Sequence, residues 1–179
     1  TRPADVLPML EKHFGDWQAP STARPTRTMP VATPTTAPRV FLVDKPGAIQ
    51  SNILVGLATA SSVAPNRLEM DTMNALLAGN FTSRINMNLR EDKHWSYGAR
   101  SSLADARGQR PWLLSAPVQT DKTVESMREI LREVTDFIGE RPATADEVAR
   151  VRHRDVRALS GRYETHAAVA GAIAELITL

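Results

Sequence analysis

The pattern of polar and apolar positions changes after the first 38 residues and there becomes typical of strands. Residues 39–43 are rich in strand-forming side chains and end at the turn formers of residues 44–47. The next residues that share one face of an extended chain, at period two, are Ile49, Ser51, Ile53, Val55 and Leu57. The pattern predicts two strands that meet at a tight turn.

Two segments further along the chain show apolar residues at helical spacing instead. Pro65 suits the first position of a helix, and the apolar residues after it form a stripe that ends at Gly79. A second stripe runs through Phe81, Ile85 and Leu89. The spacing predicts two consecutive helices after the first pair of strands.

A second pair of strands is predicted after these helices. Residues 95–106 and 111–119 have strand composition, and Gly108 marks the turn between them. Asp121 is expected to cap the next helix, because its carboxylate can accept hydrogen bonds from the free N–H groups of a first turn. The apolar stripe of that helix comprises Val124, Met127, Ile130, Leu131, Val134 and Ile138.

Thr144 and Glu147 form a capping-box pattern that opens another helix, and an alanine-rich helix is expected over residues 165–179. The element order is then ββααββαα, with two hairpins each followed by helices. This order predicts an α+β fold of two layers, an antiparallel sheet with helices on one face. We assign the domain to residues 39–179 and expect it to be truncated at its end.

The first 38 residues have a different character. Residues 4–17 predict a short amphipathic helix that ends at Gly15. The stretch after it carries five prolines among threonine, alanine and arginine, so it can neither continue a helix nor enter a central strand. This composition is typical of an extended linker, and a polyproline ligand for a recognition domain is the less common alternative.

Composition fits a globular protein, since 42% of the 179 residues are hydrophobic and 23% are charged. No apolar run approaches the roughly 20 residues of a membrane-spanning helix, so we expect no membrane partner. The net charge is only +2 and aromatic residues that could stack on bases are few, so we expect no nucleic-acid partner. We interpret the central arginines as dispersed surface charges: Arg84, Arg90, Arg100, Arg107 and Arg110.

The most distinctive polar segment spans residues 79–98 and places Arg90 and Tyr97 seven residues apart. Arginine brings a charged planar fork and tyrosine a phenolic donor, which suit stabilising an oxyanion or gripping a peptide backbone. Neither side chain can activate water on its own. The plainer alternative is a solvated arginine at a helix end beside a half-buried strand tyrosine, and composition alone favours that alternative.

The rest of the sequence supplies no metal ligands or base for such a site. The chain has no cysteine, and its four histidines lack the H-E-x-x-H or H-x-x-E-H spacing of zinc peptidases. We interpret His94, inside the distinctive segment, as an exposed polar residue. Residues 153–155 read HRD, as in a kinase catalytic loop, but no glycine-rich loop or D-F-G accompanies them. We expect this chain to bind no metal by itself.

Three blocks of the sequence resemble a known family. In chain order they read LVDKPGAIQSNILVG, NFTSRINMNLREDKHWSYG and APVQTDKTVESMREIL. Together they resemble the C-terminal half of pitrilysin and insulinase-type zinc peptidases, relatives of mitochondrial processing peptidase. The resemblance runs from about residue 39 to about residue 160, and FGDW at residues 14–17 resembles the end of a preceding half.

The resemblance implies two homologous α+β halves that clasp a peptide substrate, on one chain or on two. The N-terminal half would carry the zinc ion and its glutamate base, so this half would be inert alone. Arg90 and Tyr97 match an arginine and a tyrosine of the C-terminal half. By resemblance, Tyr97 would donate to the oxyanion, and Arg90 would hold the substrate backbone or support Tyr97. A periplasmic location is also implied.

The sequence departs from the family pattern at Asn80, where a second glycine is common, and at His94 and Trp95. These differences leave substrate preference open. The main alternative is a catalytically inactive structural or peptide-binding protein of the same fold. A ferredoxin-like RNA-binding module would need aromatic residues on its sheet face, and Trp95 and Tyr97 are too few for that.

Overall fold

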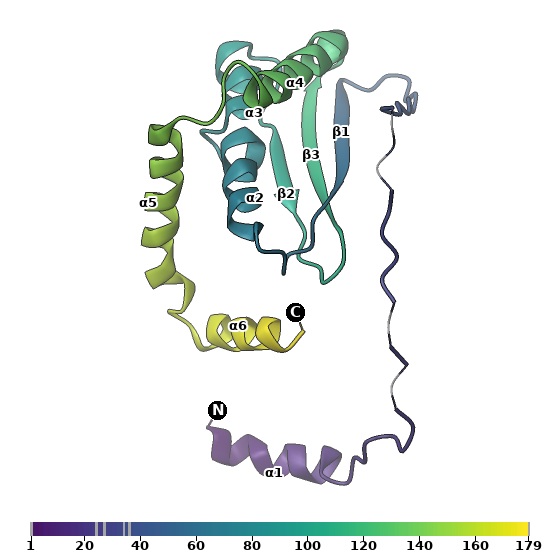
Figure 1. The fold of residues 1–179 in the computed structure, drawn as a ribbon, viewed down its shortest axis with the longest axis vertical. Coiled ribbons are helices and arrows are strands. Elements are labelled where there is room, and N and C mark those ends of the chain that lie inside the picture. The colour runs from purple at the N-terminus through teal and green to yellow at the C-terminus, as the bar shows by residue number, and fades with distance from the viewer. Residues whose placement is uncertain (1, 24, 27, 34, 36, 179) are drawn as a thin grey trace.

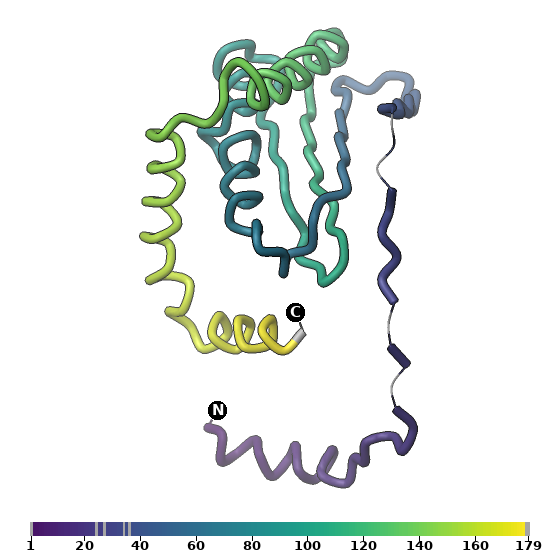
Figure 2. Tube along the Cα trace, in the orientation of Figure 1, coloured from purple at the N-terminus to yellow at the C-terminus, as the bar shows by residue number. Residues whose placement is uncertain are grey.

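Figure 1 shows a computed structural model of the chain, which describes residues 2–23, 25–26, 28–33, 35 and 37–178. A sheet and the helices beside it form the main body. Helix α1 (Pro3–Phe14) lies apart from this body and has no buried residue, and it confirms the short helix predicted near the N-terminus. Figure 2 traces the long segment between α1 and the sheet, whose described residues form no helix or strand.

The described residues form an antiparallel sheet of three strands in the order β1-β3-β2. β1 (Gln50–Thr59) pairs along its whole length with β3 (Arg110–Gln119), and β2 (Arg100–Leu103) pairs with the other edge of β3. The second predicted hairpin is therefore confirmed, although its first strand is limited to Arg100–Leu103 and does not extend over residues 95–106. The α+β fold class with an antiparallel sheet is also confirmed.

Helices cover one face of the sheet, and the last two helices of the chain extend beyond it (Figure 1). Two of the helices end in π-helical turns, in which backbone hydrogen bonds span five residues instead of four. None of the described helices is long and apolar enough to cross a bilayer. In chain order the elements are α2 (Arg67–Asn74) with π-turn η1 (Ala75–Gly79), α3 (Arg84–Asn86) with π-turn η2 (Met87–Asp92), the 3₁₀ turn η3 (Thr120–Lys122), α4 (Thr123–Ile138), α5 (Ala145–Arg162) and α6 (His166–Thr178). Leu179, the last residue of the predicted final helix, lies outside the described residues.

The core lies between the sheet and the helices on its covered face. Strand β3 turns every second side chain inward, and its buried apolar residues are Trp112, Leu114, Ala116 and Val118. Ile85 and Leu89, from α3 and η2, are fully buried in the same cluster. Burial of an aliphatic side chain contributes about 1.5–3 kcal/mol. The core therefore anchors the helical segment that also carries Arg90.

The predicted strand at residues 39–43 is wrong, because the structure leaves this segment outside the sheet. Its four apolar residues are 74–91% exposed. The Ala48 N–H bonds to the Lys45 carbonyl at 3.2 Å, and Gly47 has a φ of 77°, as in a type II turn with Pro46 at its first central position. Type II turns splay the flanking strands, whereas the turns that favour hairpins have the mirror-image geometry.

The predicted helix starts give mixed results. The capping box is confirmed, because Thr144 Oγ1 accepts from the Glu147 N–H at 3.2 Å and Glu147 Oε2 accepts from the Thr144 N–H at 2.8 Å. Asp121 as the cap of α4 is wrong, because it lies inside η3. The Thr123 hydroxyl donates to the Thr120 carbonyl at 2.7 Å. A 3₁₀ turn, and not an acidic cap, therefore leads the chain into α4.

Two of the central arginines are not the surface charges that composition suggests. The first is Arg110, whose side chain is only 2% exposed. Its guanidinium lies 3.3 Å from the Asp71 carboxylate and 3.5 Å from the Asp105 carboxylate, and its Nε donates to the Ala60 carbonyl at 3.3 Å. A buried guanidinium requires such partners. Arg110 therefore joins α2 to the ends of two strands.

Arg84 is the second inward-facing arginine. Its Nε and Nη2 donate to the two carboxylate oxygens of Glu147 at 2.9 and 2.7 Å, and Nη2 also donates to the Pro142 carbonyl at 3.0 Å. The guanidinium lies 5.0 Å from the centre of the Phe137 ring. The side chains of Arg84 and Glu147 are 15% and 18% exposed. This bidentate pair connects α3 with the start of α5.

Acid is expected to weaken the Arg84–Glu147 pair. Hydrogen bonds from Arg84 hold the pKa of Glu147 at about 2, below the 4.5 of an isolated glutamate. Because the folded-state pKa is the lower one, the stabilisation is complete above pH 4.5 and is lost as the pH falls toward 2. The free energy of unfolding in urea, measured across this pH range, should therefore separate wild type from Glu147→Gln at neutral pH and bring them together in acid.

Asp146→Asn is the matched control for this pH experiment, because it removes an exposed acid from the same first turn of α5. It should show a smaller difference from wild type at neutral pH. A difference between wild type and Glu147→Gln that stays constant down to acid pH contradicts the assignment.

Candidate functional site

Arg90 and Tyr97 lie side by side in the structure. Arg90 belongs to η2, and Tyr97 belongs to the loop that leads from η2 to β2. The Arg90 guanidinium carbon lies 5.3 Å from the centre of the Tyr97 ring and 4.7 Å from the centre of the Phe81 ring. Both distances fall within the roughly 6 Å range of cation–π contacts. The structure thus brings together the two residues that the sequence pairs and adds an aromatic neighbour.

This group of side chains faces solvent. Tyr97 is 85% exposed, Phe81 is 55% exposed and the Arg90 side chain is 34% exposed. The Arg90 Nε lies 3.2 Å from a Glu91 carboxylate oxygen. In the part of the chain that the structure describes, the Nη groups of Arg90 therefore remain available to another acceptor. The phenol and the guanidinium can both donate hydrogen bonds to a carbonyl or an oxyanion, but neither is a base at neutral pH.

A π-helical turn and a left-handed residue shape the backbone between Arg90 and Tyr97. The Lys93 N–H bonds to the Asn88 carbonyl, five residues back, at 3.0 Å. His94 has a φ of 56°, which is uncommon for residues other than glycine, and its Nδ1 lies 3.0 Å from the Arg90 carbonyl. His94 is exposed, as the sequence suggests, and its role in this structure is to turn the chain. Irregular turns of this kind are frequent at functional sites.

The loop that carries Tyr97 is tied to the end of β3. The Ser96 hydroxyl donates to the Pro117 carbonyl at 2.6 Å and accepts from the Gly98 N–H at 3.0 Å. The backbone and side-chain N–H groups of Gln119 donate to two successive loop carbonyls at 2.9 and 3.0 Å. Tyr97 therefore projects into solvent from a fixed backbone, which is the arrangement that preorganised donors require.

The residues that the structure describes include no group of three or more histidine, aspartate or glutamate side chains that could hold a metal ion. These residues therefore do not fit a zinc ion. The chemistry that they can carry at Arg90 and Tyr97 is hydrogen bonding and stabilisation of negative charge.

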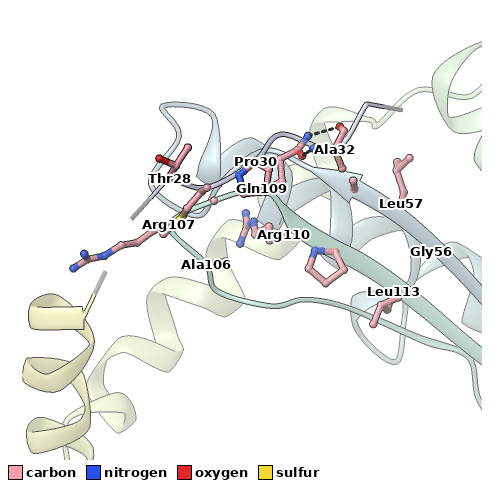
Figure 3. Close-up of a pocket in the computed structure, with 14 residues that line it drawn as sticks. Thr28, Pro30, Ala32, Gly56, Leu57, Ala106, Arg107, Gln109, Arg110 and Leu113 are labelled. Atoms are coloured by element: carbon pink, nitrogen blue, oxygen red, sulfur yellow. Dashed lines mark hydrogen bonds between the residues drawn. The ribbon is translucent and has the colours of Figure 1, made fainter. Parts of the chain in front are cut away.

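A cavity of about 720 Å³ lies at the other end of β3 (Figure 3). It is lined by β1, by the hairpin around Gly108 and by Thr28, Met29, Pro30 and Ala32 of the linker. The Gln109 side chain holds the linker there, because its amide oxygen and nitrogen bond to the N–H and the carbonyl of Ala32 at 2.6 and 3.3 Å. The cavity therefore belongs to the linker contact and is separate from the Arg90 site.

Sequence reasoning missed three residues of the Arg90 site: Phe81, Asn86 and Gln119. The spacing of Phe81 predicts a helical position, whereas the structure places it before α3. No local pattern marks Gln119, since its contacts with the loop arise only when the sheet forms. No local pattern singles out Asn86 either, because Asn88 lies two residues further on in the same predicted helix.

Comparison with solved structures finds the same fold in several proteins. A protease from Helicobacter pylori has a TM-score of 0.81 and 19% identity, over 99% of this chain and 43% of that one. The peptidase M16 inactive domain from Pseudomonas fluorescens has a TM-score of 0.61 and 15% identity, over 69% of this chain and 29% of that one. A candidate zinc protease from Bordetella pertussis Tohama I has a TM-score of 0.57 and 17% identity, over 72% of this chain and 75% of that one.

At these identities the likeness shows the fold alone, and the matched part is less than half of the Helicobacter and Pseudomonas chains. No curated protein matches the chain. The family model described as the peptidase M16 inactive domain matches residues 2–154, which is most of the chain. This match bears out the resemblance to the C-terminal half of such peptidases, and the chain belongs to the peptidase M16 inactive-domain family.

Proposed function

We propose that this chain is the zinc-free half of an M16 metallopeptidase, and that it supplies substrate-binding and oxyanion-stabilising residues to a partner half that carries zinc. The observation that carries the proposal is the contact between Arg90 of η2 and the exposed ring of Tyr97, whose loop is hydrogen-bonded to β3. Membership of the inactive-domain family supports the assignment of zinc to one half and of substrate binding to the other.

In this proposal the Tyr97 hydroxyl donates a hydrogen bond to the oxyanion that forms when water attacks the scissile carbonyl of a peptide. Arg90 holds the substrate backbone through its Nη groups, or it supports Tyr97 through the cation–π contact. The zinc ion of the partner half, when bound, supplies the activated water. The chain alone is then inert. A periplasmic location is part of the proposal and rests on the sequence resemblance.

The second candidate function is a structural or peptide-binding role in which the same fold cleaves nothing. The family description, an inactive domain, is compatible with this role. The two candidate functions differ in whether a zinc-binding half accompanies this chain. An inverted zinc motif in the full-length chain or in a neighbouring reading frame favours the peptidase, and its absence from both favours binding.

Reconstitution tests the proposal directly. The zinc-loaded N-terminal half that is encoded with this chain is mixed with increasing amounts of it, and hydrolysis of a fluorogenic peptide is followed. Neither half alone should cleave the peptide, and the rate should rise with added chain until the two are equimolar. Zinc analysis should find the metal in the N-terminal half. Equal rates with and without this chain overturn the proposal.

A further inference from the structure

Asn86 lies between the two backbone segments that carry the rings beside Arg90. Its Nδ2 donates to the Phe81 carbonyl at 2.6 Å, and its Oδ1 accepts from the Ala99 N–H at 2.9 Å. The residue is only 3% exposed. One buried side chain is therefore bonded both to the segment before α3 and to the end of the Tyr97 loop.

These two bonds account for a polar residue at this position. Asparagine is a weak helix former, and burying its amide without partners is costly. Its neighbours on the same helical segment, Ile85 and Leu89, are fully buried apolar residues. Gly98 lies beside it, and a Cβ built at Gly98 would lie 3.5 Å from the Asn86 Oδ1, in ordinary van der Waals contact. The amide thus replaces apolar packing with a bond to each flanking segment.

We infer that Asn86 is a positioning residue for Arg90 and Tyr97: its amide sets the spacing of the Phe81 segment and the Tyr97 loop around the Arg90 guanidinium. Asn86 acts through these side chains and has no contact with substrate in this inference. The structural part stands on the two hydrogen bonds and the two cation–π contacts. Only its consequence for cleavage rests on the proposed function.

Asn88 offers a matched control on the same helical segment. It is 5% exposed, and its Nδ2 donates to the carboxylates of Glu129 and Glu133 on α4 at 2.8 Å each. Asn88→Ala removes an amide as buried as that of Asn86. It leaves the bonds to Phe81 and Ala99 in place.

NMR of the chain tests the structural part, by comparing wild type, Asn86→Ala and Asn88→Ala. Ring currents from Phe81 and Tyr97 should shift the Arg90 side-chain resonances upfield in wild type. This shift should be lost in Asn86→Ala and kept in Asn88→Ala. Asn86→Asp, which keeps the acceptor for Ala99 but loses the donor, should lose part of the shift and serves if the alanine variant does not fold. Unchanged Arg90 resonances in folded Asn86 variants overturn the inference.

Cleavage by the assembly with the zinc-bearing half separates this inference from the proposed function. A displacement of about 1 Å at a reacting group can lower turnover about 100-fold, so Asn86→Ala should lose about that factor in kcat, with a smaller change in KM. Asn88→Ala should keep the wild-type rate. Lost Arg90 shifts with wild-type cleavage support positioning by Asn86 and count against the proposed function. Wild-type shifts with lost cleavage overturn the positioning role and leave the proposed function standing.

Discussion

The Tyr97→Phe variant of the complete enzyme is expected to lose about 100- to 1,000-fold in kcat, the typical effect of removing one preorganised oxyanion donor. Phenylalanine keeps the ring that lies 5.3 Å from the Arg90 guanidinium carbon, so the contact with Arg90 should persist. The hydroxyl is on an 85% exposed side chain, and its removal should change the free energy of unfolding by less than about 0.5 kcal/mol. Steady-state kinetics and urea unfolding measure the two effects.

The chain supplies its own control for this experiment, because it contains only one other tyrosine. Tyr163 is 51% exposed and lies just after α5. Tyr163→Phe should leave kcat unchanged. Wild-type kcat in Tyr97→Phe, or an equal loss of kcat in both variants, would contradict the proposed oxyanion role of Tyr97.

The largest expected change in stability comes from Trp112, which is 6% exposed on the covered face of the sheet. Trp112→Ala should lower the free energy of unfolding by about 3–5 kcal/mol, because it deletes a large buried side chain and leaves a cavity beside the helices. Its indole N–H also donates to Asn74 Oδ1 at 2.8 Å, and that oxygen accepts a second bond from the Ser101 hydroxyl at 2.6 Å. Urea unfolding followed by circular dichroism measures the loss.

One further tryptophan variant separates the hydrogen bond from the apolar packing, and another serves as an exposed control. Trp112→Phe keeps most of the apolar contact and loses the hydrogen bond, so it should lower stability by less than Trp112→Ala, with about 1 kcal/mol from the bond. Trp17 is 81% exposed, and Trp17→Ala should change stability by less than about 0.5 kcal/mol. A Trp112→Ala variant as stable as Trp17→Ala would contradict the described core.

The sequence predicts the elements whose cause is local. The strand at residues 111–119 follows from its composition and from the turn at Gly108, and the start of α5 follows from Thr144 and Glu147, whose hydrogen bonds lie within one turn. Residues 39–43 have equally strong strand composition, yet they do not join the sheet. Pairing depends on the turn that follows, and Pro46 before Gly47 is a type II signature that strand composition alone ignores.

The site was predictable only in part, for a similar reason. Arg90 and Tyr97 follow from the resemblance of their segment to a family, and their seven-residue spacing is visible in the sequence. Their direct contact depends on a π-helical turn, which no spacing rule anticipates. Asn86 and Gln119 act through hydrogen bonds between segments that meet only in the folded sheet and helices.

The exposed segment at residues 40–43, VFLV, bears on the solubility of the chain. It combines strong strand propensity with no proline and no charge, which is the composition of segments that seed aggregation. Arg39 precedes it, and Asp44 and Lys45 follow it. Charges that border such a segment act as gatekeepers against association with other chains. During synthesis, these three charged residues therefore oppose the association of this exposed segment with other chains.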